Sequence, residues 1–376
     1  MKKILYVMLD WGWIKQRPHF IAEMLSLDYK VDVVYRKANR VKKKDLPNKA
    51  SGENKNLSLT GFRYIPFSAI PFIRNFNIEF LNNWNIHRQL LKFGGYDYVW
   101  ITDPTQIEYI KPFIGKTTKL VYDCMDDAME FPQNKNNPVL CKRILNDEKF
   151  ILKSASIIFC SAEYLKTKIL KRAGSKRDDV IIVNNALELP SESDTDPIPD
   201  SIKEKIANIK HYSNPLIYVG TIDEWFDFDS ILYALNNNSN ITVILFGPLR
   251  TSMPKHERLK YMGTVDRKYL FNIMPLAFAL IMPFKLNELI KSVNPVKLYE
   301  YIYTGKPIIA TKYGETEKFS DFVNLYSTPE DMVQIIQEIG ENTIQKDYLK
   351  KCRTYVENNT WKERYKIVKS ALQTLD

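Results

Sequence analysis

Short apolar runs alternate with longer amphipathic segments along the whole chain. Runs rich in Val, Ile and Tyr occupy residues 3–9, 30–35, 96–102, 118–124, 156–161 and 180–184. Segments with helical spacing lie between most of them; one opens at residues 16–19, and others cover 77–93, 138–154 and 163–173. This alternation predicts βαβ units, and therefore a doubly wound parallel sheet in the first half of the chain.

The alternation is interrupted between residues 190 and 214. Pro190, Pro197 and Pro199 stand there among acidic residues, with few large apolar side chains. Strand-like runs then resume at 216–220, 241–247, 277–282 and 307–310. We therefore predict an N-terminal domain of residues 1–190, a linker of residues 191–214 and a second α/β domain of residues 215–358.

The C-terminal residues 359–376 predict one more helix. Thr360 and Glu363 form a capping box at its start, and Trp361, Tyr365 and Val368 begin an apolar stripe at spacings of three and four. Such a stripe must pack against another surface. We expect this helix to cross back to the first domain.

Composition narrows the class of protein. The 376 residues have a net charge of +10, which favours an anionic partner: nucleic acid, a phosphorylated small molecule or an anionic membrane. The four cysteines show no metal-site or disulfide spacing, and the uncharged stretch 269–284 is too short and too often interrupted to span a membrane. A cytoplasmic protein, at most peripheral to a membrane, is the prediction.

The segment 292–307 carries the strongest chemical signal. Asn294 is a good N-cap, Pro295 a good first helical residue and Gly305 a good stop, between two predicted strands. The helix N-terminus would lie at the carboxyl edge of the sheet, where free amides and Lys297 can bind a diphosphate. Glu300 lies about 8 Å further along the helix axis, where it can accept ribose hydroxyls. An ordinary surface ion pair between Lys297 and Glu300 is the alternative.

Residues 294–301, with the segment 305–310, resemble the donor-binding motif of GT-B glycosyltransferases, and in particular bacterial family 4-like enzymes of surface polysaccharide assembly. Further segments that resemble the family follow in the expected order: 183–186, 219–221, 245–248 and 261–265. The resemblance implies two Rossmann-like domains that face a central cleft. The second domain would bind a nucleotide diphosphate sugar as substrate, without a cofactor, through Gly220, Thr221, Gly247, Arg250, Thr264, Val265, Asn294, Pro295, Val296, Lys297 and Glu300.

Two features depart from that family pattern. Ser292 stands where many such enzymes have a first glutamate, which leaves Glu288 as its replacement. The turn at 221–227 lacks the Arg and Lys that often hold the diphosphate. Lys297, Arg250 and Lys285 are the remaining cations for that role.

In the first domain, the turn 10–19 follows a predicted strand and precedes a helix. Gly12 would let the backbone approach an acceptor, Trp13 could stack on a sugar, and Arg17 would help to bind it. His19 is a candidate acid or base near neutral pH. The alternative is that these side chains only pack under the loop.

A second acidic turn follows the strand 118–124. Asp126 and Asp127 are the candidates for a base that deprotonates an acceptor hydroxyl if the enzyme inverts, with Asp103 after the neighbouring strand as an acceptor-binding residue. If the enzyme retains, the donor phosphate itself could help to take that proton. A capped or ion-paired loop is the alternative. No metal site is predicted, because the Asp227–x–Asp229 pair stands where its carboxylates would begin a helix.

Residues 36–49 are strongly basic and residues 62–80 are rich in aromatics. Together they would suit an anionic membrane surface and a lipid-linked acceptor; a solvated loop and a covered strand are the alternative. The prediction is a metal-independent hexosyltransferase-type enzyme that moves a sugar from a nucleotide diphosphate donor to a lipid-linked or polysaccharide acceptor, with no nucleic acid partner. Its alternatives are an epimerase or phosphorylase of the same fold, and a basic nucleic-acid binding protein.

Overall fold

The computed structural model describes residues 1–9, 11, 15–36, 55–62, 86, 88, 95–114, 117–190, 197–341 and 346–375. The chain forms two compact units. Unit 1 combines Met1–Asn184 with Trp361–Asp376, and unit 2 is Asn185–Thr360. Each unit is described by itself below.

The described residues of unit 1 form a parallel seven-stranded sheet in the order β3-β2-β1-β4-β5-β6-β7. The order reverses between β1 and β4, so the carboxyl ends of these two strands flank a switch point, where open α/β sheets bind their ligands. The strands are β1 (Lys3–Met8), β2 (Lys30–Arg36), β3 (Leu57–Phe62), β4 (Tyr98–Ile101), β5 (Lys119–Cys124), β6 (Ile157–Cys160) and β7 (Val180–Ile182).

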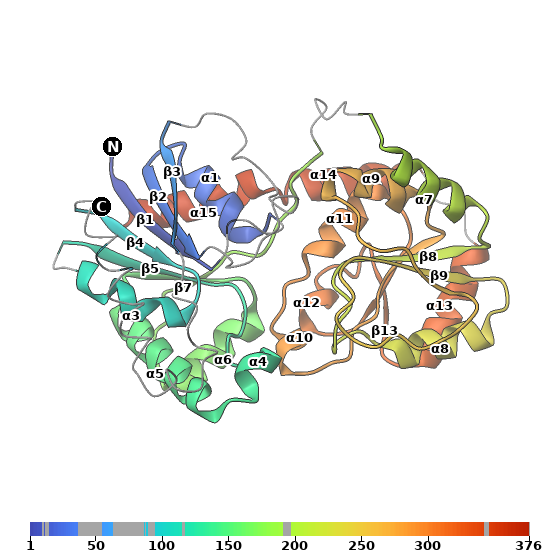
Figure 1. Ribbon diagram of the computed structural model, residues 1–376, viewed down its shortest axis with the longest axis horizontal. Helices are drawn as coiled ribbons and strands as arrows, with labels where there is room; N and C mark the ends of the chain where they lie inside the picture. The colour runs from blue at the N-terminus through green and yellow to red at the C-terminus, as the bar shows by residue number, and fades with distance from the viewer. Residues whose placement is uncertain are drawn as a thin grey trace, which may run out of the picture. The chain divides into compact units, whose positions relative to one another are not determined.

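Helices cover both faces of this sheet (Figure 1). α1 (Arg17–Leu25) and α15 (Trp361–Gln373) lie together on one face, and α3 (Ile107–Ile110), α5 (Pro138–Ser154) and α6 (Glu163–Ala173) lie on the other. The short α4 (Pro132–Lys135) precedes α5. The inner strands β1, β4, β5 and β6 are buried on both sides, which explains their nearly continuous apolar sequences.

The C-terminal helix α15 belongs to unit 1, which confirms the prediction that it crosses back to the first domain. The Trp361 ring stacks on Phe20 of α1, with ring centres 4.9 Å apart. Tyr365 extends the contact by donating its hydroxyl to Asp28 Oδ2 at 2.7 Å. The predicted apolar stripe is thus buried against the first helix of the chain.

The described residues of unit 2 form a second parallel sheet, six-stranded, in the order β10-β9-β8-β11-β12-β13. Its order reverses between β8 and β11. The strands are β8 (Pro215–Val219), β9 (Thr242–Phe246), β10 (Leu259–Tyr261), β11 (Ala279–Met282), β12 (Ile308–Thr311) and β13 (Asn324–Tyr326).

In Figure 1, α8 (Phe228–Asn237) and α13 (Pro329–Glu341) lie on one face of this sheet, opposite α7 (Asp200–Lys210), α9 (Leu270–Ile273), α11 (Val296–Thr304) and α14 (Lys346–Glu357). The shorter α10 (Glu288–Lys291) and α12 (Gly314–Glu317) flank α11 in the sequence. Asp227 caps α8 by accepting the amide hydrogen of Ser230 at 3.2 Å, which confirms that this acidic turn begins a helix.

Two details differ from the sequence-based prediction, and a third is not tested. The range 191–214 contains helix α7, because Ile202, Ile206 and Ile209 recur on one helical face, and Ile206 and Ile209 pack on the core of unit 2. Strand β3 was not predicted from the sequence; in the structure it pairs in parallel with β2. The helix expected at 77–93 lies outside the described residues apart from Ile86 and Arg88.

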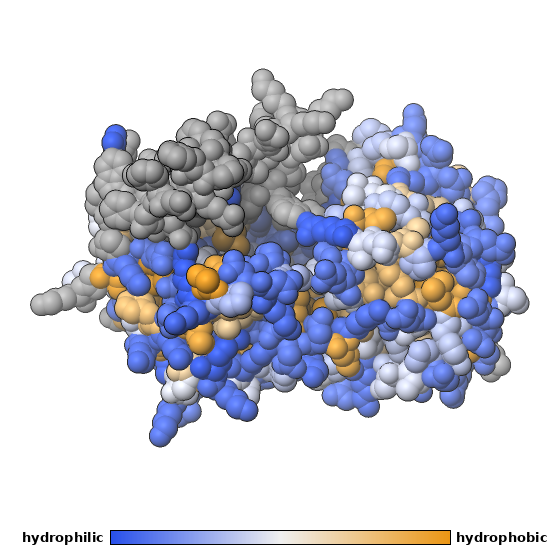
Figure 2. Space-filling view, turned by 60° about the horizontal axis from the view of Figure 1, so that its bottom comes forward, coloured by the Kyte–Doolittle hydropathy of each residue, from blue (hydrophilic) through white to orange (hydrophobic). Residues whose placement is uncertain are grey.

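The face of the molecule shown in Figure 2 is mostly hydrophilic, with hydrophobic residues in small patches. None of the helices in the described ranges is long and apolar enough to cross a bilayer.

Candidate active site

Two glycines meet at the carboxyl edge of the unit 2 sheet. Gly220 follows β8 and Gly247 follows β9, with φ angles of +151° and +130°. A Cβ at Gly247 would lie 2.0 Å from the carbonyl oxygen of Gly220, so no side chain fits there. The two strand ends are thereby held close to each other at the edge where such sheets bind ligands.

Lys297, from the first turn of α11, extends along this glycine turn. A Cβ built on Gly220 would lie 2.0 Å from its Cε, and its ammonium stands 5.9 Å from the centre of the Tyr218 ring. Burial lowers the pKa of Lys297, while the Glu300 carboxylate acts in the opposite direction. The ammonium has no ion-pair partner within the described ranges. A partly desolvated cation is therefore available to an anionic ligand.

The helix that carries Lys297 starts one residue later than predicted. Pro295 is its cap residue and Val296 its first helical residue, so the expectation that Asn294 caps a helix beginning at Pro295 was wrong. Among the residues that the structure describes, no side chain caps the first turn of α11. The amides of this turn and the helix dipole favour a negative charge at this end.

Asn294 does not cap the helix because its side chain is bonded elsewhere. Its Oδ1 accepts the amide hydrogen of Asn185 at 2.9 Å, and its Nδ2 donates to Glu315 Oε2 at 2.9 Å. The Asn185 side chain in turn donates to the carbonyl oxygen of Asn294 at 2.7 Å. Asn294 is 2% exposed, so it fixes the start of α11 and its side chain is not presented to a ligand.

Glu300 forms an ion pair that the sequence did not suggest. Its Oε1 lies 3.1 Å from Nη2 of Arg267, at the start of the short 3-10 helix Arg267–Tyr269. The anticipated alternative, a surface pair between Lys297 and Glu300, is not what forms: Lys297 lies along Gly220, and Glu300 is 8% exposed. Nothing in the local pattern identified Arg267, since the contact joins segments far apart in the chain.

Tyr301 fixes the position of α11 on the sheet. Its hydroxyl accepts the amide hydrogen of Val219, the last residue of β8, at 3.1 Å. It also lies 3.4 Å from the carbonyl oxygen of Ile281 in β11. The helix is thus anchored at the switch point between β8 and β11, which sets where Lys297 and Glu300 stand.

The other predicted donor residues border this edge in different ways. Thr221 accepts the Tyr218 hydroxyl through its carbonyl oxygen at 2.8 Å. Arg250 and Thr264 are exposed, and Val265 packs against the core. Lys285, another candidate cation, pairs with Asp229 at 2.8 Å and lines a separate hollow of about 360 Å³ with Phe226 and Phe228.

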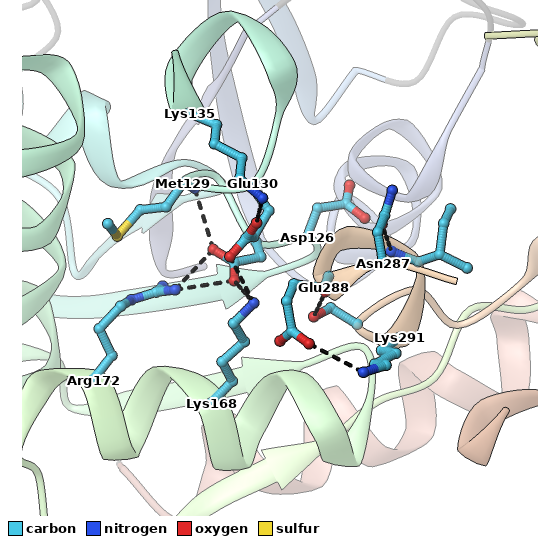
Figure 3. A network of polar contacts seen from close by, with 12 residues as sticks. Asp126, Met129, Glu130, Lys135, Lys168, Arg172, Asn287, Glu288 and Lys291 are labelled. Atoms are coloured by element: carbon cyan, nitrogen blue, oxygen red, sulfur yellow. Dashed lines mark hydrogen bonds and ion pairs between the residues drawn. The ribbon is translucent and has the colours of Figure 1, made fainter. Parts of the chain in front are cut away.

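In unit 1, the two neighbouring aspartates after β5 have different surroundings. Asp127 is fully buried and lies 2.9 Å from Arg172 Nη1 and 3.1 Å from Lys168 Nζ. Figure 3 shows the side chains of Arg172 and Lys168. Arg172 also reaches Glu148 at 2.6 Å. Asp127 therefore belongs to a buried ion-pair network. This agrees with the alternative prediction, an ion-paired loop, and not with a role as a catalytic base.

The carboxylate of Asp126 lies apart from that network (Figure 3). It is half-buried, and no hydrogen bond or ion pair ties it to any of the residues that the structure describes. Burial raises its pKa to about 6, with Arg17 acting against the rise and Asp127 and Asp123 adding to it. A carboxylate that titrates near neutral pH and has no protein partner suits a general base.

His19 is engaged within its own turn. Its Nδ1 accepts the amide hydrogen of Gln16 at 3.1 Å, its Nε2 lies 3.1 Å from the carbonyl oxygen of Trp11, and its ring packs on the Trp11 ring at 4.8 Å. The imidazole is 5% exposed. This arrangement corresponds to the packed turn named as the alternative. Gly12 and Trp13, the predicted acceptor-binding residues of the turn, lie outside the described residues.

Arg17, also predicted to bind the acceptor, is buried in an ion pair with Asp123 of β5. Its Nη2 donates to Asp123 Oδ1 at 2.7 Å and its Nε at 3.0 Å, while Nη1 donates to the carbonyl oxygen of Val183. Burial alone would lower the pKa of Arg17, but Asp123 raises it. Arg17 thus ties α1 to the sheet, with each of its three side-chain nitrogens bonded to Asp123 or to Val183.

Asp103, the remaining acceptor candidate, caps the 3-10 helix Pro104–Gln106. Its carboxylate accepts the amide hydrogen of Thr105 at 2.9 Å and the Thr105 hydroxyl at 2.5 Å. Burial raises its pKa, against the effect of these hydrogen bonds. Asp103 is therefore a capping residue, in agreement with the alternative prediction of a capped loop.

Comparisons with known proteins agree on the fold. No protein-family model matches the chain. A putative teichuronic acid biosynthesis glycosyltransferase, TuaH of Bacillus subtilis, is 29% identical over 212 residues, which are 53% of this chain and 52% of that protein. The matched region thus spans about half the length of the relative.

Two solved structures cover nearly the whole chain. HepE of Anabaena, in complex with UDP and glucose, is 15% identical with a TM-score of 0.69 over 100% of both chains. A glycosyltransferase of Rickettsia africae is 15% identical with a TM-score of 0.62 over 99% of this chain and 98% of its own. The two doubly wound units, with the last helix returned to the first, define the GT-B fold.

Proposed function

We propose that this protein is a hexosyltransferase-type glycosyltransferase that uses a nucleoside diphosphate sugar as donor. The observation that carries the proposal is Lys297: a partly desolvated ammonium lies against the Gly220 turn, in the first turn of a helix whose leading amides have no side-chain cap. A diphosphate fits this position because it can accept from the ammonium and the amides together. Glu300, further along the same helix, would accept hydroxyls of the donor ribose.

Unit 1 would bind the acceptor, with Asp126 as the base. Asp126 takes the proton of an acceptor hydroxyl, the oxygen bonds to the anomeric carbon of the donor sugar, and the nucleoside diphosphate leaves with the bonding electrons. Lys297 and the α11 amides stabilise the negative charge that develops on the leaving phosphate. This scheme needs no metal ion, because protein groups supply the positive charge; we expect EDTA to leave the activity unchanged.

The acceptor in this proposal is a lipid-linked or growing polysaccharide of the cell surface. The likeness to the Bacillus subtilis protein of teichuronic acid biosynthesis supports this class of acceptor. The enzyme would then work from the cytoplasm and contact the anionic inner face of the membrane. The basic range 36–49, proposed for that contact, lies outside the described residues except for Arg36.

A thermal-shift panel of UDP, GDP, ADP and CMP tests the donor site. We expect one nucleotide to raise the melting temperature of the wild type, and Lys297→Met and Glu300→Gln to lose most of that rise. Lys350→Met, an exposed lysine of α14, is the matched control. The proposal is wrong if no nucleotide stabilises the wild type, or if both site variants respond as it does.

An assay with a radiolabelled nucleotide sugar tests the reaction. Label transferred to a membrane lipid extract supports glycosyl transfer. An isomerised nucleotide sugar formed without any acceptor would instead show an epimerase.

A further inference from the structure

Glu300 is held by a cation from another part of unit 2. Its helix position places it near the carboxyl edge of the sheet, but a glutamate side chain has three rotatable bonds and can point in several directions. The contact between Arg267 Nη2 and Glu300 Oε1, at 3.1 Å, selects one of them. Within the described ranges, Glu300 Oε2 has no hydrogen-bond partner.

Arg267 is itself fixed from a second side. Its Nη1 lies 3.5 Å from Glu188 Oε2, in the segment where unit 2 begins. The backbone is set by Asp266, which caps the short helix Arg267–Tyr269 by accepting the amide hydrogen of Lys268 at 3.3 Å. A planar guanidinium held at two points makes a rigid support for a carboxylate.

The nearest other cation cannot replace it. Lys297 is one turn before Glu300 on α11, but its side chain lies along Gly220 and over the Tyr218 ring. The two charged side chains of α11 thus have different contacts. Lys297 lies along the glycine turn, and Glu300 pairs with Arg267. Without Arg267, the largely buried Glu300 carboxylate would lose the one ion-pair contact that it makes with the residues described.

We propose that Arg267 is a positioning residue of the donor site, which holds Oε1 of Glu300 so that Oε2 accepts the ribose hydroxyls of the nucleotide. This inference rests on the proposed function. It makes Arg267 a determinant of selectivity for ribose over deoxyribose. A carboxylate that is held in place accepts a hydrogen bond from the 2′-hydroxyl, and deoxyribose has no such hydroxyl to donate. Arg267 itself does not contact the nucleotide in this scheme.

Isothermal titration calorimetry tests this with the nucleoside diphosphate that most stabilises the wild type and with its 2′-deoxy form. We expect the wild type to bind the ribose form about tenfold or more tightly than the deoxy form, as a hydrogen bond to a charged group implies. Arg267→Met should weaken binding of the ribose form by about tenfold and bring the two affinities together. Arg267→Lys, which keeps the charge but not the fork, should restore part of the preference.

Two controls separate positioning from general structure. Lys268→Met changes the neighbouring residue of the same short helix and should leave both affinities unchanged. Glu300→Gln combined with Arg267→Met should lose no more selectivity than either change alone, because both act through one carboxylate. If Arg267→Met does not fold, as judged by circular dichroism, Arg267→Lys and Arg267→Gln serve for the same comparison.

The outcomes are distinct. If the wild type binds no nucleoside diphosphate, the proposed function fails. If the wild type binds with a ribose preference that the Arg267 variants retain, only the inference about Arg267 is wrong, and it is equally wrong if both affinities fall by the same factor.

Discussion

Lys297 lies directly over Gly220: a Cβ at the glycine would come within 2.0 Å of the lysine Cε and 2.8 Å of its Nζ. The absence of a side chain at residue 220 is therefore what allows the ammonium to reach the end of β8. A glycine that the chain needs for its backbone angle also makes room for the proposed phosphate-binding cation.

Gly220→Ala and Gly247→Ala should separate binding from stability. At Gly220 an alanine is strained by the φ angle of +151°, and its methyl displaces the flexible end of Lys297, so nucleotide affinity should fall about tenfold while the loss of stability stays smaller than at Gly247. At Gly247 it meets the backbone of Gly220, which cannot move as easily, so the free energy of unfolding should fall by about 1–3 kcal/mol. Calorimetry and urea unfolding measure the two effects; equal losses of stability would contradict the assignment.

The activity should depend on the ionisation of Asp126. Its pKa is raised to about 6, and a base must be deprotonated, so kcat/KM should be constant above about pH 7 and fall tenfold per pH unit well below 6. Asp126→Asn should lower kcat by about 10²–10⁴ and remove this acid limb. Asp178→Asn, an exposed aspartate of unit 1, is the control. A wild-type acid limb that persists in Asp126→Asn would assign the base to another group.

Asp127→Asn should act on the fold, in contrast to its neighbour. The change removes one carboxylate from Arg172 and Lys168, which keep Glu148 and Glu130, so the free energy of unfolding should fall by about 1–3 kcal/mol. Circular dichroism melts of Asp126→Asn and Asp127→Asn compare the two directly. An Asp127→Asn protein as stable as the wild type but inactive would restore Asp127 as a catalytic candidate.

Arg17→Met should destabilise unit 1 for a similar reason. It removes the partner of Asp123, which is 0% exposed, so the loss should be about 3–5 kcal/mol. Replacing both residues, Arg17→Met with Asp123→Leu, should recover part of that loss because no unpaired charge remains. If Arg17 instead binds the acceptor, Arg17→Met would raise the acceptor KM while the melting temperature stayed unchanged.

Trp361→Ala should weaken unit 1 and leave nucleotide binding intact. The indole is 4% exposed and stacks on Phe20, and truncating such a residue costs about 3–5 kcal/mol. Differential scanning calorimetry should show an earlier transition, while the nucleotide dissociation constant at 20 °C stays that of the wild type. A changed dissociation constant would show that α15 also affects the donor site.

The sequence was most informative where the signal is local. The alternation of apolar runs predicts both sheets, and the segment 292–307 places Lys297 and Glu300 on a helix after β11. The start of that helix was misplaced by one residue because Asn294, a good cap by type, is bonded to Asn185 and Glu315. The isoleucine spacing that forms α7 is present in the sequence, but the nearby prolines and acidic residues favoured a linker over a helix.

The site was less predictable where it depends on distant contacts. Arg267 meets Glu300 only through the fold, so no spacing rule identifies it. Asp126 and Asp127 are adjacent residues of the same type, so only their surroundings distinguish them. Asp127 pairs with Arg172 and Lys168, whereas the Asp126 carboxylate has no such partner among the described residues. Arg17 and His19 were chosen for their chemistry, but burial directs both toward structural partners.

The position of α15 in unit 1 has a consequence for synthesis on the ribosome. Unit 2 is one continuous stretch, Asn185–Thr360, and can close as soon as that stretch has emerged. Unit 1 begins first but lacks Trp361 and its helix until residues 361–373 have also emerged, so its apolar α1 surface stays uncovered while the whole of unit 2 is made. Unit 1 is therefore completed only after unit 2, and we expect chains that stop before residue 361 to leave the α1 surface exposed to chaperones and proteases.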